Sequence, residues 1–335
     1  MTTPLKIGIN GFGRIGRAAF KVILDTPELE VVGINDLIPN ENLAYLLKYD
    51  SVYGRLPQSI SATENGIQVD DHEYPVTHIK DPATLPWGDL NVDVVFECTG
   101  VFTKREDLAK HLHAGAERVM LSAPTKDEEL LTVVHGAADT KTDDRIISCA
   151  SCTTNCITPI IEIIGRRIGI KKATLTTLHA YTASQSLVDG PHKKMRRGRA
   201  GAENLVPTST GAAVATTKAL PQYKGLFDGV AVRAPIPVGS LADIVILTER
   251  ETSVEEINNI FREEAVSARY LFVLAVSDDE LVSSDIVQDP HASIVDLNMT
   301  QVVDGDLVKI MSWYDNEWGY VNQMVRQALS WVDSS

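Results

Sequence analysis

The stretch that decides the fold is Leu5-Lys6-Ile7-Gly8-Ile9-Asn10, followed by Gly11-Phe12-Gly13-Arg14-Ile15-Gly16. The first six residues resemble a strand, and the glycine-rich segment opens a helix expected over residues 14–24. In such a strand-turn-helix unit the first glycine allows a tight turn, the second lets backbone amides approach a pyrophosphate, and the third permits close helix packing. The positive end of the helix faces the anion. Residues Gly11 to Gly16 therefore predict a phosphate-binding turn.

A carboxylate stands where a dinucleotide site needs one. Asp36 follows a second expected strand, residues 31–35, and lies twenty residues after Gly16. A carboxylate there accepts hydrogen bonds from a ribose hydroxyl pair. Its charge also repels the additional phosphate of NADP, so NAD is the favoured cofactor. The alternative to a dinucleotide site is a structural glycine turn with an aspartate on the surface. The alternative to the preference for NAD is that Leu37 or the loop reshapes the pocket.

The two halves of the chain differ in their pattern. In the first half short apolar runs at 92–97, 118–122 and 145–148 alternate with helical stretches such as 104–114, which predicts an α/β fold with a Rossmann-type, doubly wound parallel sheet. The second half has longer strands, expected at 173–180, 229–235, 243–250 and 307–314, with Asp304-Gly305 suited to a hairpin turn. This half predicts an α+β domain with a mainly antiparallel sheet, and a closing helix is expected over about 319–332.

Length and composition limit the class of protein. The chain has 335 residues, which suggests two domains, and its 44% hydrophobic and 23% charged residues are typical of a globular protein rather than a disordered or fibrous one. A formal charge of -14 opposes binding to nucleic acid. No basic leader precedes an apolar stretch and no apolar run approaches about 18 residues, so a cytoplasmic, unanchored protein is expected.

Three of the four cysteines crowd into eight residues: Cys149, Cys152 and Cys156. Ser151 is a plausible N-cap, which puts Cys152 in a first helical turn where the helix dipole stabilises a thiolate. Cys152 is therefore the favoured nucleophile. Pro159 leaves the boundaries of this helix open, because it removes a backbone donor.

Cysteines in this chain also fit two roles other than that of a nucleophile. Cys98 sits in a strand without a basic partner, as a buried structural cysteine would. The spacing Cys149-x-x-Cys152 is also compatible with a metal or dithiol site, but structural zinc generally needs four ligands and no second such pair is present. No metal is expected.

A thiolate needs a base, and His179 in the strand 173–180 is a candidate that the residues alone do not select, because a lone strand histidine is more often structural. The segment 184–208 contains too many glycines and prolines for a regular element. It carries a basic island of His192, Lys193, Lys194, Arg196, Arg197 and Arg199. This island is either a solvated loop or an anion site or subunit contact.

Taken together these residues closely resemble the phosphorylating glyceraldehyde-3-phosphate dehydrogenase family, over nearly the whole chain. The matching stretches are residues 9–17, Ala150-Ser151-Cys152-Thr153-Thr154-Asn155, His179-Ala180-Tyr181-Thr182, residues 207–213 and residues 313–320. The resemblance implies an NAD-binding domain, residues 1–150, which the C-terminal helix 317–335 joins. It also implies a catalytic domain, residues 151–316, that includes the 184–208 loop, and assembly as a homotetramer.

The resemblance further implies the chemistry of a glycolytic and gluconeogenic step. Cys152 attacks the aldehyde carbon of glyceraldehyde 3-phosphate, His179 takes the proton, and NAD accepts the hydride. The resulting thioester is attacked by inorganic phosphate to give 1,3-bisphosphoglycerate. A neighbouring imidazole activates the thiol, and covalent capture conserves the oxidation energy as a thioester.

The family pattern also implies individual binding residues. One anion site uses Thr182, Arg197 and Arg233, and the other uses Ser151, Thr153, Thr210 and Gly211. Asn316 resembles the residue that binds the nicotinamide amide. Thr99, Gly100 and Ser122 follow strands that line the cofactor cleft.

Some residues depart from the family pattern. Cys149 replaces a common Asn, Ser184 replaces a common Asp and weakens one contact expected near the substrate phosphate, Val321 replaces a usual Ser, and Ile236 replaces a usual Thr. None of these changes removes a catalytic atom. Cys149 suggests a reversible disulfide with Cys152 under peroxide; the alternative is that its side chain only fills the volume of the usual Asn.

Parts of the sequence also fit two other functions, a related dehydrogenase and an RNA-binding protein. An erythrose-4-phosphate dehydrogenase shares the nucleophile but hydrolyses its thioester, and Thr208-Ser209-Thr210-Gly211 argues against it because this segment resembles the inorganic phosphate cradle. An RNA-binding protein with an idle enzyme site would use the basic loop, but intact Cys152 and His179 oppose that reading.

Overall fold

The computed structural model describes residues 3–137 and 142–332, which separate into two compact units. The first unit comprises Met1–Val133, Thr140–Ala150 and Met324–Ser335, and the second comprises Val134–Asp139 and Ser151–Gln323. The expected domains and closing helix include residues 1–2, 138–141 and 333–335, which lie outside the described residues.

The first unit contains a nine-stranded sheet in the order β10-β11-β9-β8-β1-β2-β7-β6-β5. All pairs from β10 to β7 are parallel, and β6 and β5 add antiparallel pairs at one edge. The doubly wound parallel sheet is therefore confirmed. The strands are β1 (Leu5–Asn10), β2 (Leu29–Asn35), β5 (Ile60–Ala62), β6 (Gly66–Val69), β7 (His72–Thr77), β8 (Val94–Glu97), β9 (Arg118–Leu121), β10 (Leu131–Thr132) and β11 (Ile146–Ser148).

This unit also contains the helices α1 (Arg14–Leu24), α2 (Asn40–Lys48) and α3 (Arg105–His113), a 3-10 helix (Pro82–Thr84), and the strand pair β3 (Tyr49–Asp50) and β4 (Gly54–Arg55). The bounds of α1 agree with the sequence prediction. Leu108 of α3 packs with Trp87, Val95 and Val119 in a buried cluster. Burial of such side chains contributes about 1.5–3 kcal/mol each.

The second unit contains a seven-stranded sheet in the order β13-β14-β12-β15-β18-β17-β16. Four of its pairs are antiparallel, while β12–β14 and β16–β17 are parallel, so the expected mainly antiparallel sheet is confirmed. The strands are β12 (Ile170–Ala180), β13 (Val206–Ser209), β14 (Phe227–Ala234), β15 (Ser240–Thr248), β16 (Leu274–Ser277), β17 (Ser293–Val303) and β18 (Leu307–Tyr314). Asp304 and Gly305, with φ of 49° and 77°, connect β17 to β18 as expected.

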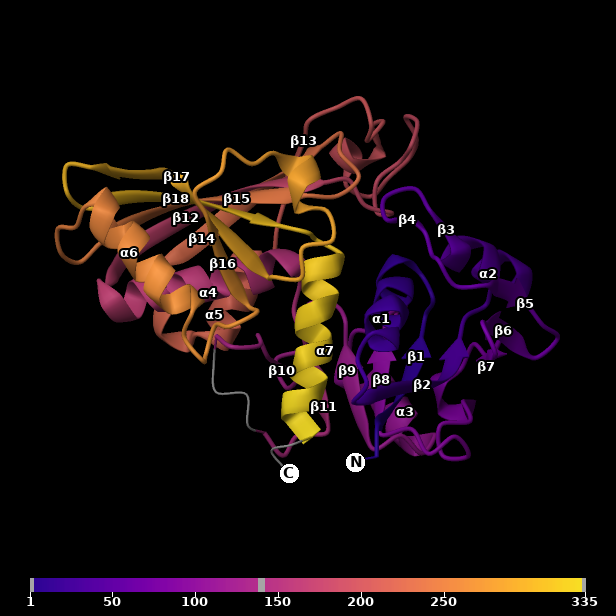
Figure 1. Ribbon diagram of the computed structural model, residues 1–335. Helices are drawn as coiled ribbons and strands as arrows, with labels where there is room; N and C mark the ends of the chain where they lie inside the picture. The colour runs from indigo at the N-terminus through magenta and orange to yellow at the C-terminus, as the bar shows by residue number, and fades with distance from the viewer. Residues whose placement is uncertain (1–2, 138–141, 333–335) are drawn as a thin grey trace. The chain divides into compact units, whose positions relative to one another are not determined.

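Figure 1 shows α4 (Cys152–Arg167) and α5 (Ala212–Ala219) on one side of this sheet. Isoleucines of α4 share a core with β15 and β18, and α6 (Val254–Ala265) adds Ile257, Ile260 and Phe261 to it. The last helix, α7 (Trp318–Val332), contributes residues to both units. Helix α4 continues through Pro159, which settles the helix boundary that the sequence leaves open.

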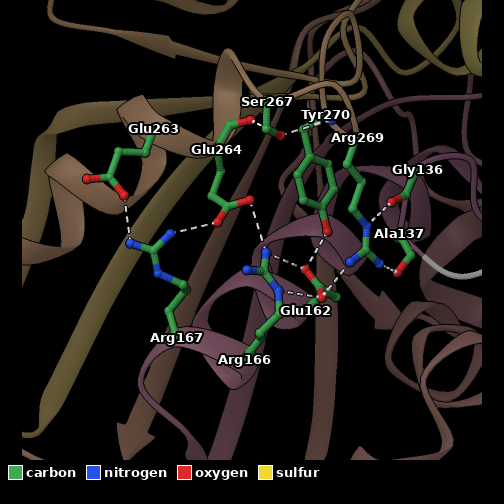
Figure 2. A network of polar contacts seen from close by, with 10 residues as sticks. All are labelled: Gly136, Ala137, Glu162, Arg166, Arg167, Glu263, Glu264, Ser267, Arg269 and Tyr270. Carbon is green, nitrogen blue, oxygen red and sulfur yellow. Dashed lines mark hydrogen bonds and ion pairs between the residues drawn. The ribbon is translucent and has the colours of Figure 1, made fainter.

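A buried carboxylate anchors α4 within the second unit (Figure 2). Glu162 accepts hydrogen bonds from Arg166 Nε at 2.9 Å, Arg269 Nη1 at 2.9 Å and the Tyr270 hydroxyl at 2.5 Å. Arg269 also donates to the carbonyl oxygens of Gly136 and Ala137. One guanidinium thus ties the 134–137 segment to the helix whose first residue is Cys152.

Within the described ranges 3–137 and 142–332, no helix has the length and apolar character needed to cross a membrane.

Candidate active site

The glycine turn has the geometry that its sequence predicts. Gly11 has a φ of 93°, and a Cβ there would lie 2.6 Å from the backbone nitrogen of Thr99. A Cβ on Gly16 would lie 2.1 Å from the Gly11 carbonyl oxygen, whereas a Cβ on Gly13 would meet no described atom within 4 Å. The first and third positions therefore require glycine for backbone packing, and the second leaves an open approach to the N-terminus of α1.

The Asp36 carboxylate lies against this turn. Its Oδ2 accepts the Phe12 N–H at 2.7 Å, and its Oδ1 accepts the Ile38 N–H at 3.1 Å. A cavity of about 350 Å³ adjoins it, lined by Asn10, Gly11, Gly13, Asn35, Asp36, Leu37, Ile79, Lys80, Cys98, Thr99, Val101 and Phe102. An open helix N-terminus and a carboxylate at one cavity fit the pyrophosphate and ribose of a dinucleotide.

The other predicted cofactor residues differ in what they contact. Arg14 forms a 2.8 Å ion pair with Asp50, and Gly100 has a φ of 69° directly after Thr99. Burial raises the pKa of the Cys98 thiol to about 12, although a hydrogen bond with Ser122 opposes the shift. This shift favours the neutral thiol at Cys98, which is partly buried and lines the cavity.

Sequence reasoning missed a buried polar network behind the cavity. Glu97 ends β8 and accepts hydrogen bonds from Asn10 Nδ2 at 2.6 Å, Thr99 N at 2.8 Å and His111 Nε2 at 3.1 Å. Trp87 Nε1 donates to His111 Nδ1 at 2.9 Å, so the proton of this imidazole resides on Nε2. A lone glutamate closing an otherwise apolar strand is the sequence signal that would have revealed the network.

In the second unit, the start of α4 presents the predicted nucleophile. The Ser151 hydroxyl accepts the Thr154 N–H at 3.2 Å and caps the helix, which confirms Ser151 as N-cap and Cys152 as the first helical residue. The Cys152 Sγ lies 3.4 Å from Nε2 of His179, near the end of β12. The thiol and the imidazole are within reach of direct proton transfer.

Burial and the Arg233 guanidinium shift the pKa values of His179 and Cys152. His179 Nδ1 lies 2.8 Å from the Ala180 carbonyl oxygen, and Arg233 Nη1 contacts both Nδ1 and that oxygen. Burial, reinforced by Arg233, lowers the pKa of His179 to about 3. Burial also raises the pKa of Cys152, although Arg233 opposes that shift. Burial thus acts against the charged form of both the thiol and the imidazole.

The structure brings together the residues predicted for one anion site. Arg197 Nε donates to Thr208 Oγ1 at 3.0 Å, and Ser184 Oγ lies 3.5 Å from Arg197 Nη1 and 2.8 Å from Thr182 Oγ1. The charge of Arg197 contributes to the lowered pKa of Arg233, whose largest cause is burial. Thr182, Arg197 and Arg233 therefore form one positively charged cluster beside His179.

Residues predicted for the second anion site use their hydroxyls internally. Ser151 caps α4, Thr153 Oγ1 lies 2.9 Å from the Tyr314 hydroxyl, and Thr210 Oγ1 accepts the Ala212 N–H at 3.1 Å. Gly211 precedes α5, and a Cβ there would meet no described atom within 4 Å. The Thr210 hydroxyl accepts in this contact and keeps its own O–H to donate to an anion, and the backbone N–H groups at the starts of α4 and α5 are further donors.

Asn316 and Cys149 are both buried. Asn316 Oδ1 accepts the Ser240 hydroxyl at 2.9 Å. Cys149 is 4% exposed, and burial raises the pKa of its thiol. All four cysteines are free thiols, and the peroxide-dependent link between Cys149 and Cys152 stays a prediction. Across residues 3–137 and 142–332 no three metal-binding side chains cluster.

Comparison with known proteins gives the family of this chain. The family model described as glyceraldehyde 3-phosphate dehydrogenase, NAD binding domain, matches residues 5–105, and the model of the C-terminal domain of the same family matches residues 151–316. A protein named glyceraldehyde-3-phosphate dehydrogenase from Mycobacterium avium is 48% identical over 330 residues, 96% of each chain. Proteins of the same name from Streptomyces coelicolor and Haloarcula vallismortis are each 46% identical, over 96% and 97% of both chains.

These matches confirm the resemblance that the sequence motifs indicate. The cofactor domain and the catalytic domain are both represented, and the cofactor is NAD. The chain belongs to the glyceraldehyde-3-phosphate dehydrogenase family and is an NAD-dependent enzyme of that family.

Proposed function

We propose that Cys152 and His179 carry out the phosphorylating oxidation of glyceraldehyde 3-phosphate. The observation that carries this proposal is the 3.4 Å contact between Cys152 Sγ and His179 Nε2 at the N-terminus of α4. Nε2 takes the thiol proton, the thiolate forms a bond to the aldehyde carbon, and the imidazolium returns the proton to the resulting oxyanion to give a hemithioacetal. Nε2, neutral again, then takes the hydroxyl proton of this adduct as its hydride leaves. NAD, when bound, supplies the hydride acceptor that turns this adduct into a thioester.

Inorganic phosphate then attacks the thioester carbonyl, which releases the Cys152 thiolate and 1,3-bisphosphoglycerate. The side chains of Thr182, Arg197 and Arg233 bind the phosphate of the substrate, because they form the positively charged cluster beside His179. Ser151, Thr153, Thr210 and Gly211 hold the attacking phosphate through hydroxyl groups and backbone N–H groups at the starts of α4 and α5. Asn316 orients the nicotinamide amide, and the residues from Gly11 to Gly16 with Thr99, Gly100 and Ser122 shape the cofactor cleft.

The preference for NAD over NADP follows from Asp36. Its carboxylate adjoins the glycine turn and the cavity, where it accepts hydrogen bonds from ribose hydroxyls and repels a phosphate on the same sugar.

The active form is a homotetramer. Large apolar side chains are exposed on the 184–208 loop, at 81% for Leu187, 73% for Val188, 88% for Met195 and 67% for Leu205. Several large apolar side chains exposed on one loop favour a role for that loop in subunit contacts. Sedimentation equilibrium should give a mass four times that of the 36.6 kDa chain, and a monomer that retains full activity would contradict the proposal.

The enzyme works in the cytoplasm, and its net charge of -14 disfavours nucleic acid as a partner.

A steady-state assay tests the function. NADH formation from glyceraldehyde 3-phosphate is measured with and without inorganic phosphate, with NAD and NADP side by side, and with arsenate in place of phosphate. Turnover should require phosphate or arsenate and should favour NAD. Turnover that is independent of both anions would instead indicate hydrolysis of the thioester, and the absence of any turnover would overturn the assignment of Cys152 and His179.

A further inference from the structure

Four polar residues form a row across the carboxyl ends of neighbouring strands in the first sheet. Glu97 of β8 lies opposite Asn10 of β1. Asn10 lies opposite Asn35 of β2, which in turn lies opposite Thr77 of β7. Thr77 is half-buried and the other three are buried. The row therefore lies beneath the surface at the edge of the sheet where α/β proteins bind their ligands.

The hydrogen bonds along this row all point toward Glu97. The backbone N–H of Ile79 donates to Asn35 Oδ1 at 2.9 Å. Asn35 Nδ2 donates to Asn10 Oδ1 at 2.8 Å, and Asn10 Nδ2 donates to Glu97 Oε2 at 2.6 Å. Because a backbone N–H only donates, Ile79 fixes the orientation of both side-chain amides.

Two further donors reach Glu97 from other directions. The Thr99 N–H donates to Oε1 at 2.8 Å, and His111 Nε2 donates to Oε2 at 3.1 Å. The Trp87 indole N–H occupies His111 Nδ1, so this imidazole is neutral and carries its proton on Nε2. Glu97 thus accepts hydrogen bonds at both of its oxygens. Two acceptor ends are what an ionised carboxylate supplies and an amide does not.

The network ends on the wall of the cofactor cavity. Four of its members line the cavity of about 350 Å³ beside the glycine turn: Asn10, Asn35, Ile79 and Thr99. They come from the ends of four neighbouring strands, and Glu97 lies fully buried behind them. A Cβ on Gly11 would lie 2.6 Å from the Thr99 nitrogen, so the segments that hold Asn10 and Thr99 approach closely. Glu97 bonds to both sides of this approach.

We propose that Glu97 is a positioning residue for the cofactor: as the common acceptor of this network, it fixes the spacing of the Asn10 and Thr99 segments before NAD binds. This rests on the proposed placement of NAD in the cavity beside the glycine turn. Glu97 acts through the residues that line the cavity. The cavity wall is then ordered during folding rather than on binding, which favours affinity for the cofactor.

Glutamine has nearly the same shape as glutamate but cannot replace it at position 97. If its NH2 group points toward Thr99, it meets a backbone N–H that cannot reverse. If it points toward Asn10, both side-chain amides of the row have to flip, and Asn35 then presents its own NH2 group to the Ile79 N–H. Each orientation sets two donors against each other. Buried groups are left without partners, and the segments that carry them are displaced.

The test compares NAD affinity in two variants with the same chemical change. Glu97→Gln should raise the Kd for NAD, measured by calorimetry, by about tenfold. The KM for NAD should rise in parallel while kcat stays nearly unchanged. Glu162→Gln alters another buried carboxylate that accepts several hydrogen bonds, in the second unit. It should lower stability to urea but change the Kd by less than about twofold.

Two results of this comparison overturn the proposal. One is a Kd for NAD in Glu97→Gln equal to that of the wild type. The other is an equal loss of affinity in Glu97→Gln and Glu162→Gln, because the effect would then be a general consequence of lost stability.

Hydrogen–deuterium exchange of the wild type tests the proposal without a substitution. Peptides that contain the Ile79 and Thr99 N–H groups should be protected in the NAD-free protein, because both groups donate to buried acceptors. NAD should add little protection at these two positions. Fast exchange that becomes slow only when NAD is added would show that the cofactor, rather than Glu97, orders the cavity wall.

Failure of the proposed cofactor site has a different signature. If NAD slows exchange nowhere in the glycine turn, residues 11–16, the cofactor binds elsewhere, and the role of Glu97 falls together with the site. If NAD slows exchange in this turn while Glu97→Gln leaves the Kd unchanged, only the role of Glu97 is wrong.

Discussion

The Asp36 carboxylate accepts the backbone N–H of Phe12 at 2.7 Å, within the glycine turn that opens α1. The residue predicted to contact the ribose is therefore also a structural support of the phosphate-binding turn. Both tasks need an acceptor oxygen, but only discrimination against NADP needs a negative charge. The two roles separate experimentally because asparagine keeps the acceptor and loses the charge.

We expect Asp36→Asn to narrow the preference for NAD over NADP by about tenfold, or about 1.4 kcal/mol, while the KM for NAD changes little. Asp36→Ala should narrow the preference and also raise the KM for NAD, because the Phe12 N–H loses its acceptor. Steady-state kinetics with both cofactors gives these ratios. Unchanged discrimination in Asp36→Asn would show that the charge is not beside the ribose.

Cys152→Ser should lower kcat by at least about 10³-fold, because a serine hydroxyl beside His179 is a far weaker nucleophile. NAD affinity, measured by calorimetry, should stay nearly unchanged. Cys156→Ser is the matched control on the same helix: the Cys156 thiol contacts Ser312 Oγ at 3.6 Å and is buried away from the imidazole. Substantial turnover in a verified Cys152→Ser preparation would refute the nucleophile.

His179→Asn should lower kcat by about 10²–10⁴-fold, less completely than loss of the nucleophile. In the wild type, burial raises the pKa of Cys152, so its alkylation by iodoacetamide should accelerate as pH rises through the folded-state pKa of the thiol. Without the imidazole acceptor the profile should move to higher pH. The rate of iodoacetamide inactivation, measured from pH 5 to 10, checks this expectation.

Ser184 Oγ, a neutral hydroxyl, lies 3.5 Å from Arg197 Nη1. In Ser184→Asp the new carboxylate should pair with the Arg197 guanidinium and hold it in place, which restores the contact that Ser184 weakens. We expect the KM for glyceraldehyde 3-phosphate to fall severalfold while the KM for NAD stays constant. Ser184→Asn is the uncharged control. Equal changes in both Michaelis constants would indicate collapse of the loop instead.

Tyr270→Phe should destabilise the second unit by about 1–3 kcal/mol, because the buried Glu162 carboxylate loses the hydroxyl that donates to it at 2.5 Å. Urea unfolding followed by circular dichroism measures the change. Tyr45→Phe, at a side chain that is 62% exposed, should alter stability by no more than about 0.5 kcal/mol. Equal stability of the two variants would mean that Glu162 does not depend on this hydrogen bond.

Local features of this chain could be predicted from sequence because their causes lie within a few residues. The bounds of α1 follow from the glycine turn and the apolar pattern after it. The Ser151 cap depends on a hydroxyl three residues from its donor, and the turn at Asp304 and Gly305 depends on two adjacent residues that tolerate positive φ. The cofactor turn and the position of Cys152 in its helix were accordingly determined by sequence alone.

Contacts between distant segments were decided only by tertiary structure. In the second sheet, strands β13, β16 and β17 escaped prediction, and the expectation that 184–208 holds no regular element is wrong, because a 3-10 helix (Met195–Gly198) and the start of β13 lie there. No local pattern gives the strand order that makes two of the pairs in the second sheet parallel. That register places Arg233 beside His179, although 54 residues separate them. The buried Glu97 and His111 contact arises in the same way, across 14 residues. Such pairings depend on which apolar faces pack together, and the free energy of that packing is a property of the whole domain rather than of any short segment.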